Sequence, residues 1–161
     1  MTSSDPASAE LHELLSRELD LMDQLADVMQ RKQRLLVASS TAGLAELSHQ
    51  EEELAQRLAR LERQRIDLVA RQHGLDPQQA AQLSAAQLGG DALLDDLAGG
   101  MRLRIDELQQ LQDDNRVLTE RLVEYGELVL KLVTQGEGQP GYNSHGRPAE
   151  GSRRELLNCR I

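Results

Sequence analysis

The sequence contains almost no aromatic residues: Phe and Trp are absent, and Tyr125 and Tyr142 are the only two tyrosines among 161 residues. Aromatic side chains contribute much of the buried area in most globular cores, so a core here must be aliphatic. Ala, Leu, Glu, Gln and Arg dominate the sequence, and these are strong helix formers. This composition favours long helices and coiled coils over a β-sandwich, a barrel or an α/β sheet.

Other absences exclude whole classes of function. The chain has 18 Lys and Arg against 27 Asp and Glu, and its net charge of −9 argues against a nucleic-acid partner. No apolar run approaches the roughly 18–20 residues of a membrane span, and the first ten residues do not resemble a secretory signal. The single cysteine, Cys159, cannot form an internal disulfide. We therefore expect a reduced, cytoplasmic protein without membrane insertion.

Signals for catalysis or metal binding are also weak. The four histidines lie on different segments without metal-ligand spacing, and His49 has no second histidine four residues later. The two Gly-Gly pairs do not follow a strand, so they do not match a phosphate-binding loop. We predict no enzymatic activity, no metal site and no cofactor.

Heptad spacing of apolar residues predicts two helices in the first half of the chain. After a disordered lead over 1–7, we expect helix over 8–38 and over 42–73, with an N-cap among Ser39, Ser40 and Thr41 and a C-cap at Gly74. Glu51 and Arg65 make the seam of the second helix more polar. The heptad rows are Leu14, Leu21, Val28 and Leu35; Leu15, Met22, Met29 and Leu36; and Leu47, Leu54, Leu61 and Leu68.

The second half begins with a connector over 76–98, in which Asp76 to Gln79 has capping-box spacing and two Gly-Gly pairs punctuate short helical pieces. A third long helix is predicted over 101–134, with apolar content that widens around the helix near its end and a stop at Gly136. Its seam is formed by two heptad rows: Met101, Leu108, Asn115, Leu122 and Val129; and Leu111, Leu118, Tyr125 and Leu132.

The predicted fold is therefore all-α: an antiparallel bundle of three long helices with a short helical connector between the second and third. The coiled-coil bundle is expected over 8–135 and a flexible tail over 136–161, rich in Gly, Pro, Ser and Arg. Such seams must be buried within the chain or against a partner, so the chemistry expected of this protein is association.

Three residues stand out by their position. Asn115 interrupts an apolar seam, either to fix register or to contact the backbone of a partner in a groove. Tyr125, in the same seam, is interpreted as a core residue with its hydroxyl at the edge. Tyr142 is a lone aromatic residue in the tail, and is either a docking residue or a tail residue without a role.

The run from Leu111 through Asn115-Arg116 to Leu122, followed by Tyr125 to Leu132 and then Gly141-Tyr142 to Gly146, resembles the C-terminal half of the FlgN-type flagellar export chaperones. In that family, a long helix carries an Asn-Arg-x-Leu element and a short Tyr-containing motif follows it. The upstream leucine-rich hairpin and Gly74-Leu-Asp fit as well, so the resemblance covers about residues 10–147.

The resemblance implies a cytoplasmic chaperone that binds the C-terminal helical segments of hook–filament junction (hook-associated) proteins and delivers them to the export gate. It places docking to the gate on Tyr142, and leaves residues 148–161 without a family counterpart. A homodimer stays open, and so does the alternative of a structural coiled-coil or scaffold protein that only self-associates. The implied client-binding residues are Asn115, Leu118, Leu122, Tyr125, Val129 and Leu132.

Overall fold

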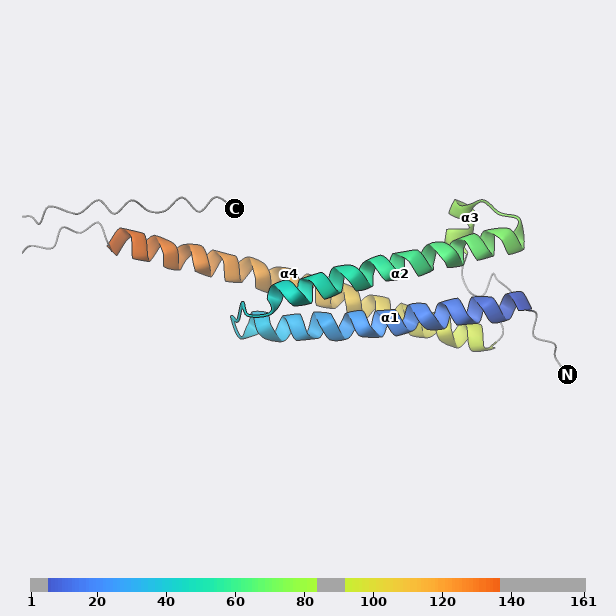
Figure 1. The fold of residues 1–161 in the computed structure, drawn as a ribbon, viewed down its shortest axis with the longest axis horizontal. Helices are drawn as coiled ribbons and strands as arrows, with labels where there is room; N and C mark the ends of the chain where they lie inside the picture. The colour runs from blue at the N-terminus through green and yellow to red at the C-terminus, as the bar shows by residue number, and fades with distance from the viewer. Residues whose placement is uncertain (1–5, 84–91, 137–161) are drawn as a thin grey trace, which may run out of the picture. The chain divides into compact units, whose positions relative to one another are not determined.

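The computed structural model describes residues 6–83 and 92–136, and its regular elements are all helices (Figure 1). They are α1 (Pro6–Val37), α2 (Leu44–His73), α3 (Pro77–Gln82) and α4 (Ala92–Gly136). Three long helices with a short helix between the second and the last confirm the predicted all-α class. The predicted disordered lead and flexible tail lie outside the described residues, apart from the residues at their inner ends that belong to α1 and α4.

The hairpin of α1 and α2 is closed by a short turn whose predicted cap is wrong. The N-cap of α2 is Gly43 rather than Ser39, Ser40 or Thr41, and it makes no side-chain hydrogen bond. Its φ of +86° lies in the left-handed region that glycine adopts without a steric cost, so backbone conformation rather than a hydroxyl starts the helix. The other end follows the prediction, because Gly74 is left-handed and its N–H bonds the carbonyl of Ala70.

Two buried or half-buried ion pairs set the register of this hairpin. Arg65 Nε of α2 lies 3.0 and 3.2 Å from the two carboxylate oxygens of Glu18 on α1, and Lys32 Nζ lies 2.9 Å from Glu51 Oε2. The pairs are two heptads apart on each helix and occur in opposite order, as an antiparallel pairing requires. The two residues that made the α2 seam look more polar, Glu51 and Arg65, are thus the ones that pair with α1.

The short helix α3 begins at the predicted capping box. Asp76 Oδ1 accepts a hydrogen bond from the Gln79 backbone N–H at 2.8 Å, and the Asp76 backbone N–H donates to Gln79 Oε1 at 3.2 Å. Pro77 occupies the first helical turn, where its missing N–H costs nothing. Ala80 of α3 is buried in a core cluster with α2, which secures this short element.

The start of α4 differs from the prediction, because the helix begins at Ala92 and continues through Gly99 and Gly100. Each glycine in a helix costs about 1 kcal/mol relative to alanine. That cost is offset by Leu94 and Met101, which lie on either side of the glycines and are both buried in the core. A Gly-Gly pair is a local signal for the end of a helix, but the packing of Leu94 and Met101 in the core outweighs that signal here.

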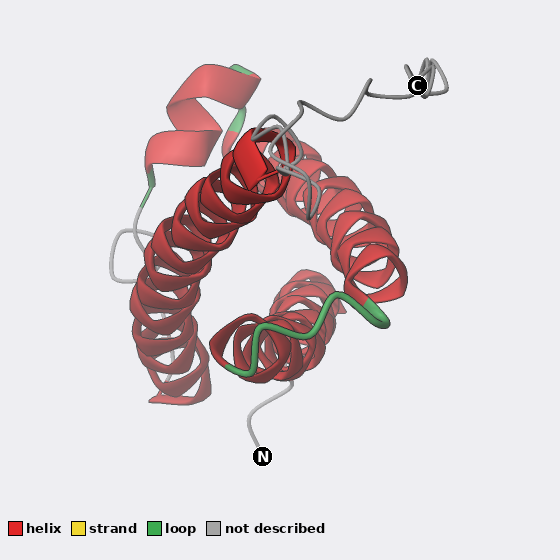
Figure 2. Ribbon diagram, turned by 90° about the vertical axis from the view of Figure 1, so that its left-hand side faces the viewer, coloured by secondary structure: helices red, strands yellow, loops and turns green. Residues whose placement is uncertain are grey.

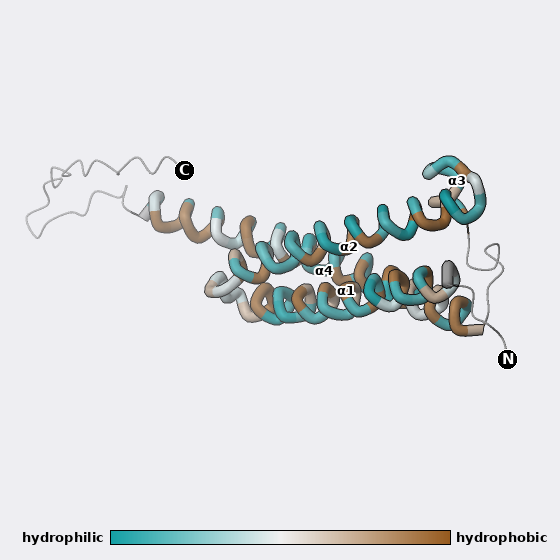
Figure 3. The backbone as a smooth tube through the Cα atoms, turned by 45° about the vertical axis from the view of Figure 1, so that its right-hand side comes forward, coloured by the Kyte–Doolittle hydropathy of each residue, from teal (hydrophilic) through white to brown (hydrophobic). Residues whose placement is uncertain are grey.

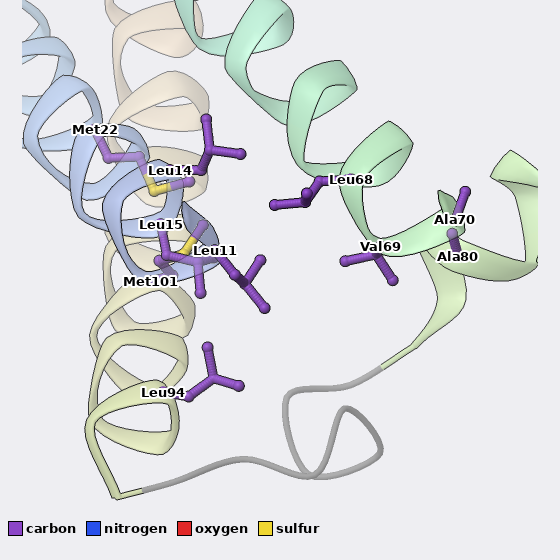
Figure 4. Close-up of a cluster of buried hydrophobic side chains, with 10 residues drawn as sticks. All are labelled: Leu11, Leu14, Leu15, Met22, Leu68, Val69, Ala70, Ala80, Leu94 and Met101. Atoms are coloured by element: carbon purple, nitrogen blue, oxygen red, sulfur yellow. The ribbon is translucent and has the colours of Figure 1, made fainter. Parts of the chain in front are cut away.

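Two clusters of buried side chains run along the bundle. The first joins the beginning of α1, the end of α2, α3 and the beginning of α4, as the labelled residues of Figure 4 show. The second joins the rest of α1 to the beginning of α2 and to Leu111 of α4. Residues up to Glu120 of α4 therefore run parallel to α1 and antiparallel to α2, which confirms the predicted antiparallel bundle. Figure 2 shows the helices in red and the turn that joins α1 to α2 in green.

The contacts divide the chain into two compact units after Glu120, although α4 is continuous across this point. The first unit holds the helical bundle. The described part of the second unit is the end of α4, residues 121–136. None of the helices in the described part of the chain combines the length and hydropathy that crossing a membrane requires.

Candidate functional site

The end of α4, residues 121–136, is apolar and exposed. Seven large hydrophobic side chains between Val123 and Val133 are 39–64% exposed, and Figure 3 shows brown, hydrophobic positions recurring along these last turns. Single exposed leucines are common on protein surfaces, but a contiguous group of this size marks an interaction site. The exposed residues are Val123, Tyr125, Leu128, Val129, Leu130, Leu132 and Val133.

The apolar surface extends around most of the helix at this end. The polar side chains Glu120, Glu124, Glu127 and Lys131 recur at spacings of three or four residues, so they share one narrow stripe. Apart from Arg121, the large hydrophobic residues occupy most of the rest of the circumference. A helix that is hydrophobic over so wide an arc is normally covered on more than one side.

The long helices of the chain differ in length. The helix α4 has 45 residues, whereas α1 and α2 have 32 and 30. At 1.5 Å per residue, α4 is about 68 Å long and the hairpin helices are roughly 45–48 Å long. Leu94, near the start of α4, shares a cluster with Leu11 of α1.

Polar contacts join α4 to α1 along the stretch of α4 from Arg104 to Asn115. Arg104 bridges Asp23 of α1 and Glu107 of α4, and Gln30 Nε2 donates to Glu107 Oε1 at 3.1 Å. Gln33 Nε2 lies 3.4 Å from Asp114 Oδ2. After Asn115, the side-chain hydrogen bonds of α4 within the described residues stay inside α4, as in the 3.2 Å bond from Arg116 to Glu120.

Asn115 ends this stretch, and it is buried inside the bundle. Its Nδ2 donates to the backbone carbonyl of Met29 at 2.9 Å, which ties α4 to α1 at one height. Its Oδ1 is buried and has no hydrogen-bond partner among the described residues. The contact supports the register-setting interpretation of this asparagine, because the backbone that it bonds belongs to its own chain.

The other residues predicted to bind a client fall into two groups. Leu118 and Leu122 are half-buried, whereas Tyr125, Val129 and Leu132 are exposed. The interpretation of Tyr125 as a core residue is wrong, since 64% of it is exposed. Tyr142 lies outside the described residues.

The predicted site omitted four residues that the structure exposes beside it: Val123, Leu128, Leu130 and Val133. The signal was present in the sequence, because the apolar content of α4 widens at these positions. A strict two-row seam selects only one face of a helix, so residues beside that face were left out.

The main electrostatic feature lies within the bundle, away from the end of α4. Glu18 is 1% exposed, and burial raises the pKa of its carboxyl group, an effect that Arg65 opposes and Glu62 reinforces. Sequence reasoning missed this group, although Glu18 lies midway between Leu11 and Leu25 at heptad spacing. Among the described residues, no three His, Cys, Asp or Glu side chains are grouped so that they could hold a metal ion.

Comparison with known protein families identifies a family for this chain. A protein family described as FlgN protein matches residues 1–150, which is nearly the whole chain. No curated protein and no solved structure matches it. The match includes the leucine-rich hairpin, the Asn115-Arg116 element and all of α4. The chain therefore belongs to the FlgN family of flagellar export chaperones.

Proposed function

We propose that this chaperone binds its clients through the exposed end of α4, and that the clients are hook–filament junction (hook-associated) proteins. In this proposal the C-terminal helical segments of the client cover the apolar side chains of residues 121–136. The protein acts in the cytoplasm and then delivers the client to the flagellar export gate. The observation that carries the proposal is the group of seven exposed hydrophobic residues between Val123 and Val133.

The arrangement suits a client that is itself helical. Tyr125, Leu128 and Leu132 have the i, i+3, i+7 spacing with which one helix packs against another. Because apolar residues also lie on either side of this row, one client helix would leave part of the surface exposed. A client that contributes more than one helical segment buries the remainder, and most of the binding free energy comes from this burial.

Of the residues predicted to contact the client, Leu118, Leu122, Tyr125, Val129 and Leu132 remain in the proposal. Asn115 is given a supporting role, since its side chain is engaged with Met29 of its own chain. It holds α4 in register against α1, so that the residues after it are presented as a continuous helix. Val123, Leu128, Leu130 and Val133 join the proposed surface because they are exposed there.

A double substitution tests the proposed surface. The variant Leu128→Asp/Leu132→Asp places two carboxylates on the exposed end of α4, and we expect binding of a purified C-terminal client fragment to fall at least 100-fold by calorimetry. The control is Leu103→Asp, which changes a leucine earlier in α4 that is more exposed than either of these two and should retain wild-type affinity. Unchanged client affinity in the double variant would refute the proposal. Dissociation of a homo-oligomer by the same variant, without an effect on clients, would favour the scaffold alternative.

The two tyrosines separate binding from delivery. Tyr125→Ala should weaken client binding, because Tyr125 lies on the proposed surface. Tyr142→Ala should leave client affinity unchanged and reduce secretion of hook-associated proteins, if Tyr142 docks the loaded chaperone at the export gate. Equal losses of binding and secretion in Tyr142→Ala would contradict this division of roles.

A further inference from the structure

A second candidate surface lies between α1 and α2, and the proposed client surface does not include it. Two adjoining depressions of about 630 and 560 Å³ form one groove, which we call the outer groove, and they share Gln24 and Arg57. Every described residue that lines either depression belongs to α1 or α2. The groove thus lies on the α1–α2 hairpin, and α4 reaches only its edge, where Arg104 pairs with Asp23.

The floor of the outer groove is apolar at both ends. Leu21 and Leu61 line the first depression, and Val28 and Leu54 line the second. Three of these four side chains are buried in the core, and Leu61 is half-buried. A groove between two long helices with an apolar floor is the shape that accepts a third helix.

The charges along the rim of the groove change sign from one end to the other. The first depression carries Arg17, Arg57 and Arg60 against a single carboxylate, that of Asp20. The second is lined by one cation, Arg57, and by three carboxylates, those of Asp23, Asp27 and Glu53. Each carboxylate has a basic neighbour outside the lining, namely Arg104 for Asp23, Arg31 for Asp27 and His49 for Glu53, and these pairs are solvent-accessible and therefore weak. The basic end is unusual in a chain whose net charge is −9. Such a gradient favours a partner whose charges have the opposite order.

The basic end is available to a partner. Arg57 makes no hydrogen bond or ion pair within the described part of the chain. Arg60 uses its Nε for the carbonyl of Gln56 in the previous turn, at 3.3 Å, and Arg17 pairs with the exposed Glu13. Exposed pairs of this kind are worth little, so arginine can exchange them for a carboxylate of a partner.

We propose that the outer groove binds an amphipathic helix of another protein, with acidic residues in its N-terminal half and basic residues in its C-terminal half. Its apolar stripe covers Leu21, Val28, Leu54 and Leu61, its carboxylates lie over Arg57 and Arg60, and it runs parallel to α1. The lining residues of α1 extend from Arg17 to Val28, which corresponds to about 16 Å or three turns of a bound helix. Acidic N-terminal and basic C-terminal halves also complement the dipole of the bound helix itself.

Two synthetic peptides test the orientation. Both carry the same leucine stripe and the same composition of Glu and Lys, but one has Glu in its N-terminal half and the other has Lys there. Both are stapled to equal helicity, which removes the difference that the helix dipole would cause in the free peptides. We expect fluorescence anisotropy to give at least tenfold tighter binding to the full chain for the peptide with N-terminal Glu.

Charge reversal in the groove supplies the second test. Arg57→Glu/Arg60→Glu should weaken the favoured peptide at least tenfold and remove the preference between the two peptides. The matched control, Arg63→Glu/Arg71→Glu, makes the same charge change at two exposed arginines of α2 that do not line the groove. It should retain most of the affinity and the preference.

Three results would overturn the proposal: equal binding of the two peptides, equal losses in the groove variant and the control, or no binding of either peptide at millimolar concentration. Sedimentation of the chain alone supplies a fourth contradicting result. If the chain self-associates, if Arg57→Glu/Arg60→Glu abolishes this self-association and if the peptide competes with it, then the groove binds a second copy of the chain. Loss of client binding through the end of α4 would not affect any of these readouts, so the two surfaces are tested separately.

Discussion

The two parts of α4 have the same heptad seam and opposite environments. Leu111 is 8% exposed in the bundle, whereas Leu132, three heptads later in the same row, is 63% exposed. The sequence pattern continues without a break, and so does the helix. Periodicity therefore indicates that a face needs cover, but it does not indicate whether the cover comes from the same chain. In this protein the first part of the seam is buried in the bundle, and the side chains of the second part are exposed.

Helix formation itself explains how the exposed part keeps its structure. A separate peptide of about 16 residues would be only marginally helical in water, because nucleation of a helix is unfavourable. Residues 121–136 continue a helix that the bundle has already nucleated, so each added residue needs only propagation. The bundle thus presents an apolar helix that would not persist alone.

The largest effect expected from this comparison comes from introducing the same charge into both parts of the seam. Leu111→Asp buries a carboxylate in the second core cluster and should reduce the free energy of unfolding by about 4 kcal/mol or more. Leu132→Asp places the carboxylate in water and should change it by less than about 0.5 kcal/mol. Urea denaturation followed by circular dichroism measures both. Similar losses in the two variants would mean that the end of α4 is packed as tightly as the bundle.

A second test concerns the buried ion pair of Glu18 and Arg65 in the bundle. Arg65→Met leaves the buried Glu18 carboxylate without its cation, which should reduce the free energy of unfolding by about 3 kcal/mol at pH 8. Burial raises the pKa of Glu18, so the folded protein keeps this proton to higher pH than the unfolded chain does. Stability from this group is therefore fully present below the ordinary pKa of 4.5 and is lost as the pH rises through the folded-state pKa.

Arg65→Met raises the pKa of Glu18 further, so its effect on unfolding should be smaller at pH 4 than at pH 8. Glu18→Gln is the companion variant, and its stability relative to the wild type should increase from pH 4 to pH 8. An Arg65→Met loss that is the same at both pH values would show that the guanidinium contributes packing rather than charge. Hydrogen exchange in residues 121–136 should respond less than exchange in the bundle, because these residues lie in the other unit.

These contrasts show how far the sequence could predict the fold. Heptad rows located the three long helices, and the capping box at Asp76 and the glycine at position 74 located two boundaries correctly. The start of α4 was missed, because a Gly-Gly pair is a local signal that buried Leu94 and Met101 override. The cap at Gly43 was missed because hydroxyl side chains just before it looked like better caps than a left-handed backbone.

The candidate site was less predictable, for a physical reason. Tyr125 and Leu111 occupy equivalent positions of one seam, but Tyr125 is exposed and Leu111 is buried. Glu18 and Arg65 are polar residues at seam positions on different helices, and only the register of the hairpin brings them together. The burial of a seam residue and the pairing of Glu18 with Arg65 both depend on contacts between helices. The spacing of residues within a single helix does not predict such contacts.

A smaller effect on stability is expected from a substitution of the buried Asn115. Asn115→Leu removes a buried oxygen without a partner and extends the apolar seam, so we expect it to increase the free energy of unfolding by about 1 kcal/mol. It also removes the bond to Met29 that fixes the register of α4. Broader backbone amide signals at the end of α4 should therefore accompany the higher melting temperature. A clear loss of stability would show that the bond to Met29 outweighs the unpaired oxygen.

The smallest expected effect distinguishes the two parts of α4 with one type of substitution. A Cβ atom at Gly99 or at Gly126 would meet nothing within 4 Å, so alanine fits at both sites. Alanine favours the helix over glycine by about 1 kcal/mol.

Gly99→Ala lies in the bundle and should increase global stability by that amount, because local and global unfolding are coupled there. Gly126→Ala should slow hydrogen exchange only in residues 121–136 and leave the melting temperature unchanged, because this part of α4 frays without opening the core. A higher melting temperature in Gly126→Ala would mean that the exposed end unfolds cooperatively with the bundle, and the contrast between the two parts of the helix would then be one of exposure alone.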